Sequence, residues 1–129
     1  MPSWVWTCVE FQLPFATMKK TLDILSWNVN GIRACCKKGF VAWLGRCGGD
    51  IIGLQEVRAR EEQLPPELKD IDHWHHHLVH AERKGYSGVS LLSKLPADDV
   101  QTRLEVEEFD AEGRLQIARF GALTIANVY

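Results

Sequence analysis

The sequence predicts an α/β fold, and three observations support this. Two short runs, 22–26 and 51–54, have the length and apolar content of buried strands. Four residues between them have the spacing i, i+3, i+4 and i+7 of one helical face: Phe40, Trp43, Leu44 and Cys47. A strand, a helix and a second strand in this order normally place the two strands parallel in one sheet.

Length and composition indicate a globular domain. A chain of 129 residues is long enough for one domain with a single core. Hydrophobic residues make up 46% and charged residues 25%, which argues against a disordered or fibrous chain. The net charge of -2 gives no overall attraction to nucleic acid, so such a contact would require a local patch. No apolar stretch reaches the length of a membrane span, and we expect no membrane partner.

The cysteines and the N-terminal segment bear on location and domain limits. The cysteines form no Cys-x-x-Cys pair, and Cys35 and Cys36 are adjacent, so we expect a reduced, cytoplasmic environment. The apolar N-terminal residues follow no basic residue and are interrupted by Glu10 and Pro14, unlike a secretory signal. We expect residues 1–20 to be an extension outside the fold, with Met18 as the natural start. Residues 21–129 would form the domain.

After the second apolar run the sequence predicts mostly strands. Residues 57–72 are charged and contain adjacent prolines, which is typical of a loop, here with room for a short helical turn. Alternating apolar residues and turn formers then predict two hairpins. The expected elements, in order, are strands at 73–81 and 86–93, a short outer strand at 100–106, an acidic turn at 107–113, and strands at 114–120 and 122–129.

Five histidines lie between positions 73 and 80, and a histidine-rich tract can bind metal. On a strand, however, His75 and His77 would share one face, while His76 and His80 would point to the other. No cysteine or carboxylate spacing completes a structural zinc set. We therefore interpret the histidines as packing residues of a hairpin, with a metal-binding tract as the alternative.

Polar residues follow both strands of the first unit. Asn28 and Asn30 come after the first strand, and Glu56 comes after the second. Parallel strands end at the same edge of a sheet, where ligands bind in open α/β folds, so we expect these side chains to converge. One carboxylate and two carboxamides suit a hard divalent cation. The simpler alternatives are a turn at Asn28 or Asn30 with Gly31 and a loop cap at Glu56.

Positive charge gathers beside these polar residues. Arg33, Lys37 and Lys38 follow the first strand, and Arg58 and Arg60 follow the second. The repeated location predicts a basic patch at the same edge. The alternative is that they are ordinary solvated charges, and this is the interpretation we prefer for Lys37 and Lys38.

Five segments, in this order, resemble the exonuclease III family of apurinic/apyrimidinic endonucleases. They are residues 25–34, 38–40, 50–56, 84–89 and 108–114. The first and third are shared across the wider endonuclease/exonuclease/phosphatase superfamily, whereas the last two narrow the likeness to its DNA repair branch. The resemblance runs from Thr21 to Tyr129. It implies the N-terminal half of a four-layered α/β sandwich, strand-rich, with mixed sheets and flanking helices.

The resemblance also implies an activity, a cofactor and a partner. The complete chain would be a monomeric base excision repair enzyme that hydrolyses DNA phosphodiester bonds at abasic sites, with 3′-to-5′ exonuclease activity at 3′ ends. The cofactor would be Mg²⁺ or Mn²⁺. A bound hard cation neutralises charge on phosphoryl oxygens and makes a water molecule nucleophilic, as this reaction needs.

Motif positions imply roles for individual residues. Glu56 corresponds to the metal-binding glutamate, and Asn28 to an asparagine at the metal and catalytic centre. Asn30 corresponds to a neighbouring polar catalytic residue, and Tyr129 to a tyrosine beside the catalytic site. Three further residues fall where members of the family contact DNA: Arg33, Arg58 and Tyr86.

The sequence departs from the family pattern in two ways. Arg58 and Val57 stand where lysine and threonine are usual, although an arginine fork fits phosphate oxygens well. The family's later Asp-x-Asn and Asp-His motifs would lie beyond Tyr129, and the histidines at 73–80 are in the wrong order to replace them. We therefore expect a domain truncated at its C-terminus and inactive alone. The alternatives are a noncatalytic remnant or partner-binding module, and a phosphoesterase with another substrate.

Overall fold

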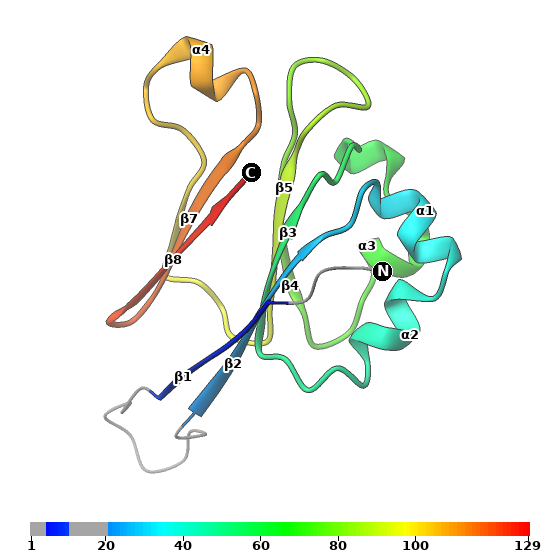
Figure 1. Ribbon diagram of the computed structural model, residues 1–129, viewed down its shortest axis with the longest axis vertical. Helices are drawn as coiled ribbons and strands as arrows, with labels where there is room; N and C mark the ends of the chain where they lie inside the picture. The colour runs from blue at the N-terminus through cyan, green and yellow to red at the C-terminus, as the bar shows by residue number, and fades with distance from the viewer. Residues whose placement is uncertain (1–4, 11–20) are drawn as a thin grey trace.

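The computed structural model describes the backbone of residues 5–10 and all of residues 21–129. The strands form two sheets, one of five strands in the order β1-β2-β3-β5-β4 and one of three in the order β6-β7-β8 (Figure 1). The elements in chain order are β1 (Val5–Glu10), β2 (Thr21–Asn28), α1 (Ile32–Lys37), α2 (Phe40–Leu44), β3 (Ile51–Gln55), the 3₁₀ helix η1 (Glu61–Gln63), α3 (Pro66–Lys69), β4 (His75–Val79), β5 (Val89–Ser93), β6 (Asp99–Gln101), α4 (Glu107–Asp110), β7 (Leu115–Phe120) and β8 (Leu123–Val128).

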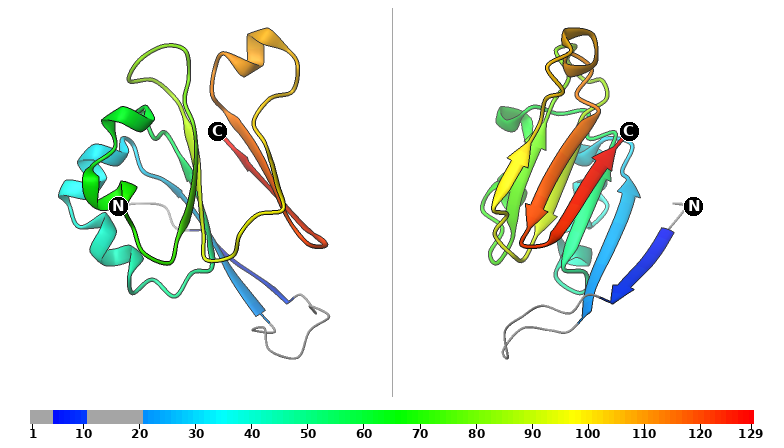
Figure 2. Two further views of the ribbon diagram at one scale, coloured as in Figure 1. Left: turned by 180° about the vertical axis from the view of Figure 1, so that it is seen from behind. Right: turned by 90° about the vertical axis from the view of Figure 1, so that its left-hand side faces the viewer.

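The elements stack in three layers. Helices α1, α2 and α3 cover one face of the five-stranded sheet, and the three-stranded sheet packs on its other face (Figures 1 and 2). Strands β2 and β3 are parallel, and the other neighbouring strands are antiparallel. This confirms the predicted strand-rich α/β fold with mixed strand directions. Within residues 21–129 no helix covers the outer face of the three-stranded sheet, where a fourth layer would lie.

The first strand-helix-strand unit differs from the prediction in its helix. Two short helices, α1 and α2, replace the single expected one, because Gly39 between them takes a left-handed conformation with φ 96°. Phe40 and Leu44 are buried on the sheet as predicted. Cys47 packs against the same core from the turn after α2 rather than from a helix. Helical spacing thus identified the buried face but not the break at glycine.

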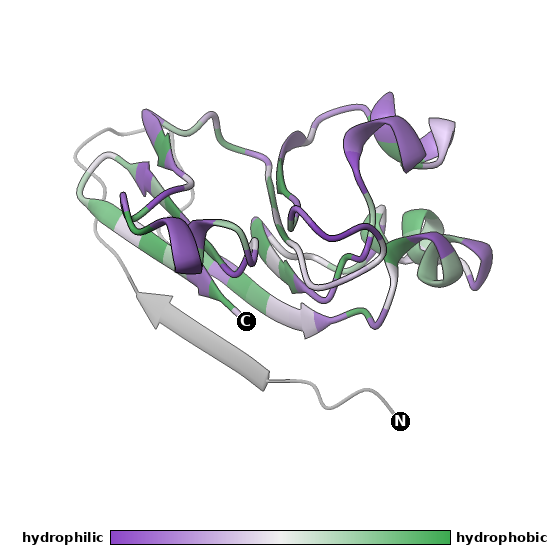
Figure 3. Ribbon diagram, turned by 90° about the horizontal axis from the view of Figure 1, so that it is seen from above, coloured by the Kyte–Doolittle hydropathy of each residue, from purple (hydrophilic) through white to green (hydrophobic). Residues whose placement is uncertain are grey.

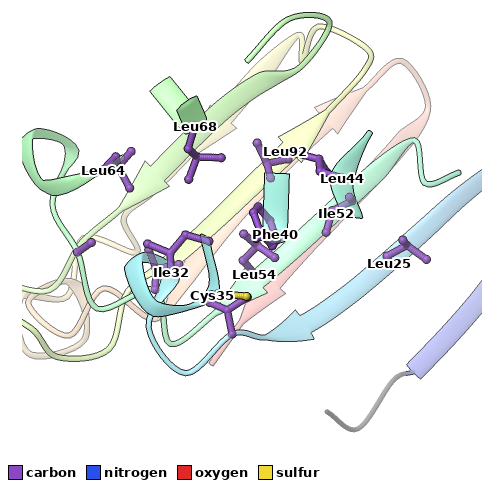
Figure 4. Close-up of a cluster of buried hydrophobic side chains, with 13 residues drawn as sticks. Leu25, Ile32, Cys35, Phe40, Leu44, Ile52, Leu54, Leu64, Leu68 and Leu92 are labelled. Carbon is purple, nitrogen blue, oxygen red and sulfur yellow. The ribbon is translucent and has the colours of Figure 1, made fainter. Parts of the chain in front are cut away.

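The core has two parts, one on each face of the five-stranded sheet. The larger part lies beneath the helices, where Leu54 and Ile52 of β3 meet Phe40 and Leu44 of α2 (Figure 4). The smaller part lies between the sheets and includes Ile51 of the same strand. Alternation along β3 therefore sends neighbouring apolar residues to opposite faces.

Both predicted hairpins are present. Strands β4 and β5 pair antiparallel, and so do β7 and β8. The outer strand β6 spans Asp99–Gln101, shorter than the expected 100–106, and the acidic turn contains the short helix α4. No helix of the described residues is long and apolar enough to cross a membrane.

The histidine tract packs only in part as expected. His76 hydrogen-bonds through Nε2 with the hydroxyl of the buried Ser90 on β5, whereas His73 lies outside the strand. Among the residues that the structure describes, no group of three or more His, Cys, Asp or Glu side chains is placed to hold a metal ion. His76 therefore packs within the hairpin as we interpreted, whereas His73, His75 and His80 are exposed.

The prediction that residues 1–20 lie outside the fold stays a prediction. The backbone of Val5–Glu10 pairs antiparallel with Thr21–Ser26 in the structure, at the edge of the five-stranded sheet. Residues 1–4 and 11–20, including Met18, lie outside the described residues.

Candidate active site at the strand ends

Asn28 and Glu56 meet at the end of β2 and β3, as the parallel pairing predicts. Asn28 pairs with Gln55 in the ladder, and Glu56 follows directly. The Asn28 side-chain amide lies close enough to the Glu56 carboxylate to help lower its pKa. The Asn28 Oδ1 atom accepts a bond from the Asn30 backbone N–H at 3.0 Å. Asn28 therefore connects the carboxylate to the following turn.

Tyr129, at the end of the three-stranded sheet, also contacts Glu56. The residue directly follows β8, and its hydroxyl donates a hydrogen bond to Glu56 Oε1. The same oxygen lies 3.4 Å from Arg58 Nη2. The structure thus brings together Asn28, Glu56, Tyr129 and Arg58, four of the residues singled out in the sequence.

The backbone around Glu56 is held in an unusual conformation. Asn30, Glu56 and Arg58 have φ angles of 47°, 53° and 53°, in the left-handed region that non-glycine residues seldom adopt. Backbone hydrogen bonds fix this path, because Gly31 N donates to Glu56 O at 2.7 Å and Arg58 N donates to Ser87 O at 2.8 Å. The three loops therefore hold one another at this end of the sheet, and such strain is common at functional sites.

The contacts of Glu56 keep it ionised. The Tyr129 hydrogen bond is the main cause that lowers the pKa of Glu56 below its usual range, and the Arg58 charge and the Asn28 amide act in the same direction. The pKa of Tyr129 is raised by the same hydrogen bond. A charged carboxylate with a neutral tyrosine donor is therefore the stable arrangement at neutral pH.

A basic cleft lies beside this carboxylate. It has a volume of about 620 Å³, and its wall includes Asn30, Arg33, Lys37 and Arg58. Arg33 and Lys37 come from α1, whereas Arg58 comes from the loop after β3. Three members of the predicted basic patch line the cleft, including Lys37, which was interpreted as ordinary surface charge. Arg60 does not line it and instead donates to Glu82 O at 2.8 Å. Lys38 is exposed and lies outside the cleft.

Tyr86 lies in a different set of contacts. Its hydroxyl donates to Glu112 Oε2 at 2.8 Å and accepts from Arg114 Nη2 at 2.7 Å. The loops that carry these residues gather at one end of the molecule, and Figure 3 looks down on this end and shows its mostly hydrophilic loops. Glu112 and Arg114 received no role in the sequence analysis, although they lie in one of the recognised segments.

Asn127 is another residue that the sequence analysis missed. It is buried on β8, where its Nδ2 donates to Leu54 O at 3.2 Å and to Ser90 O at 2.9 Å. Its Oδ1 accepts from Gln55 Nε2 at 2.8 Å. The sequence feature that could have identified it is one asparagine near the end of a mostly apolar strand segment. Asn127 ties β8 to the larger sheet two residues before Tyr129.

The donor groups at the strand ends fit a hard divalent cation. Glu56 supplies a carboxylate, and the Asn28 Oδ1 atom retains a second lone pair beyond its bond to Asn30. Mg²⁺ is commonly held by one or two carboxylates, with water and substrate phosphate oxygens filling its remaining positions. These two residues would hold the ion.

The fold and this site define the class of protein. A mixed sheet with a carboxylate and asparagine at its strand ends beside a basic cleft is an arrangement suited to phosphoester chemistry. Residues 25–129 match the Endonuclease/Exonuclease/phosphatase family. The chain belongs to this family, and the resemblance predicted from the five segments is confirmed.

Similar proteins come from animals and bacteria. The chain is 34% identical over 110 residues to the DNA repair nuclease APEX1 of Danio rerio, covering 84% of this chain and 36% of that protein. It is 36% identical over 109 residues to an exodeoxyribonuclease of Bacillus subtilis, covering 84% of this chain and 42% of that protein. The chain thus spans about two fifths of the length of these relatives.

Solved structures show the same fold. An AP endonuclease from Archaeoglobus fulgidus superposes with a TM-score of 0.71 at 28% identity, covering 84% of this chain and 40% of that one. A 3′ phosphatase from Neisseria bound to a product DNA hairpin gives a TM-score of 0.70 at 26% identity, covering 82% and 40%. The predicted fold class is confirmed.

Proposed function

We propose that this chain is part of a DNA repair nuclease that uses Mg²⁺ or Mn²⁺ to hydrolyse phosphodiester bonds at abasic sites, with 3′-to-5′ exonuclease activity. The observation that carries the proposal is the contact of Asn28, Tyr129 and Arg58 with the single carboxylate of Glu56. The relatives named for DNA repair support the substrate class.

The site would have two parts, the metal-binding residues at the strand ends and the basic cleft that holds DNA. A cation bound at Glu56 and Asn28 would offset charge on the phosphoryl oxygens and activate water. Arg33 and Arg58 would hold phosphates of the flanking strand without reading sequence. Tyr86 would contact the backbone beside them. An abasic nucleotide has no base to unstack, so moving it out of the duplex requires less free energy than flipping a paired one.

A second candidate is removal of a 3′ phosphate from a DNA end. It is favoured by the similarity to the Neisseria 3′ phosphatase, whose structure contains a product DNA hairpin. The same metal-binding residues and basic cleft would serve this reaction, because both reactions hydrolyse a phosphate ester of the DNA backbone.

Metal binding tests the site without any need for turnover. We expect residues 1–129 to bind Mn²⁺, measured as the loss of the free-ion EPR signal, and Glu56→Gln to weaken binding about 10-fold or more. Glu61→Gln, which removes an exposed carboxylate on η1, is the matched control. Equal Mn²⁺ affinity for the native chain and Glu56→Gln would contradict the metal assignment.

Incision tests the reaction. The substrates are duplexes with one abasic site or one 3′ phosphate, and the proteins are residues 1–129 and the longest product of the gene. We expect the longer product to incise the abasic duplex with Mg²⁺, Glu56→Ala to abolish incision, and residues 1–129 alone to give no appreciable incision. Release of phosphate without incision would favour the second candidate. A gene product that neither incises nor releases phosphate would favour the noncatalytic remnant.

A further inference from the structure

Arg114 lies next to Tyr129 at the open end of the β7–β8 hairpin. The two residues flank the paired strands, and Tyr129 N donates to Arg114 O at 2.9 Å, which extends the ladder by one bond. Gly113 makes this position possible. A Cβ atom there would come within 2.5 Å of Ala81 N, and its φ of 59° is left-handed. The turn before β7 is therefore pressed against the β4–β5 connection.

The Arg114 guanidinium is held in place on two sides. Its Nε donates to Glu112 Oε2 at 3.1 Å, and its Nη2 donates to the Tyr86 hydroxyl at 2.7 Å. Tyr86 in turn donates to Glu112 Oε2 at 2.8 Å, which closes a ring of three hydrogen bonds. A planar guanidinium with two directional partners has little freedom to rotate.

The fixed guanidinium also contacts Tyr129. Its central carbon lies 4.9 Å from the centre of the Tyr129 ring, and its Nη1 lies 3.4 Å from Tyr129 O. Cation–π attraction to the ring holds the tyrosine from the side of the hairpin. From that position the Tyr129 hydroxyl reaches Glu56. The contacts run in one line from Glu112 through Arg114 and Tyr129 to the carboxylate.

We infer that Arg114 is a positioning residue that holds the Tyr129 ring against Glu56, with Glu112 and Tyr86 fixing the guanidinium. Arg114 would act through Tyr129 and would not itself touch metal or DNA. The inference deepens the proposed function and rests on it only in taking Glu56 as the metal ligand. A lysine at 114 could keep the charge but could not make the same planar set of contacts.

The sequence contains two tyrosines, Tyr86 and Tyr129, so ring-labelled tyrosine gives NMR signals for this cluster alone. Tyr86→Phe assigns them. We expect Arg114→Lys to shift and broaden the Tyr129 ring signals, while Arg119→Lys, at the other end of β7, leaves them in place. Unchanged Tyr129 signals in folded Arg114→Lys would overturn the inference, whether or not the chain binds metal. If Arg114→Lys does not fold, Glu112→Gln provides the same test.

A double-mutant cycle separates positioning from a purely structural role. We expect Arg114→Lys to weaken Mn²⁺ binding about 10-fold in the native chain and to cause no further loss in Tyr129→Phe, because the contact to Glu56 is already absent there. Losses that add fully in the double variant would overturn the inference. Absence of Mn²⁺ binding in the native chain would instead contradict the proposed function and leave the NMR result to decide the positioning role.

Discussion

The two faces of the five-stranded sheet are held by different forces. Beneath the helices, thirteen of the described residues form one buried apolar cluster. Between the sheets the buried apolar cluster has five of the described residues, and buried polar side chains bridge the gap. Asn127 makes three hydrogen bonds across it, and Gln116 Nε2 donates to His77 O at 2.8 Å.

This difference indicates a division of labour. Apolar burial is strong but non-directional, so it stabilises the helix side without setting a register. Hydrogen bonds are directional, and those of Asn127 fix β8 so that the following Tyr129 reaches Glu56. We infer that the helix side supplies most of the stability and the interface between the sheets supplies the geometry of the site.

The largest effect is expected from a change on the helix side. Phe40 is 2% exposed and packs against Trp27 and Trp43, with ring centres 5.6 and 5.7 Å away. Phe40→Ala should lower the free energy of unfolding by about 3 to 5 kcal/mol, because it leaves a cavity in a packed core. Urea denaturation of residues 1–129 measures this. A loss below about 1 kcal/mol would contradict the role given to this face.

The second largest change in stability is expected from acidification, through His76 on the helix side of the sheet. Burial, together with the neighbouring His77, lowers the pKa of His76 to about 4, whereas an unfolded histidine titrates near 6.5. The unfolded chain therefore binds more protons between these values, so stability is present above pH 6.5 and is lost as the pH falls toward 4. The loss from this residue should be about 3 kcal/mol.

Unfolding at several pH values checks this prediction. His76→Gln should flatten the dependence between pH 7 and 4, while His75→Gln, at an exposed position on the same strand, should retain it. Identical pH profiles for the native chain and His76→Gln would show that His76 is not the group responsible.

The sequence predicted the helix side better than the interface between the sheets. Spacing and strand length were enough for the buried positions of Phe40 and Leu44 and for the parallel strands, because these depend on local periodicity. Convergence of Asn28 and Glu56 followed from that pairing. Periodicity does not show which buried polar groups meet across two sheets. The contacts of Asn127 and Arg114 therefore could not be predicted from the sequence.

Removal of the polar bridge should have an intermediate effect. Asn127→Ala leaves Leu54 O, Ser90 O and the Gln55 amide without their partner in a buried region, which should lower stability by about 1 to 3 kcal/mol. Because β8 loses its anchor, we also expect the Tyr129 ring NMR signals to broaden. Phe40→Ala should leave these signals sharp while the chain remains folded. Sharp, unshifted Tyr129 signals in Asn127→Ala would break the proposed division between the two faces.

The smallest changes in stability are expected from the same type of substitution, isoleucine to valine, made once on each face of the five-stranded sheet. Ile52→Val, at a fully buried position beneath the helices, should lower the free energy of unfolding by about 1 kcal/mol. Ile125→Val, at a half-buried position between the sheets, should lower it by about half as much, because less of its surface is removed from water. Denaturation of the two variants side by side compares the faces through the loss of one methylene group. A larger loss for Ile125→Val would show that the interface between the sheets is the more tightly packed of the two, and the greater stability assigned to the helix side would then be wrong.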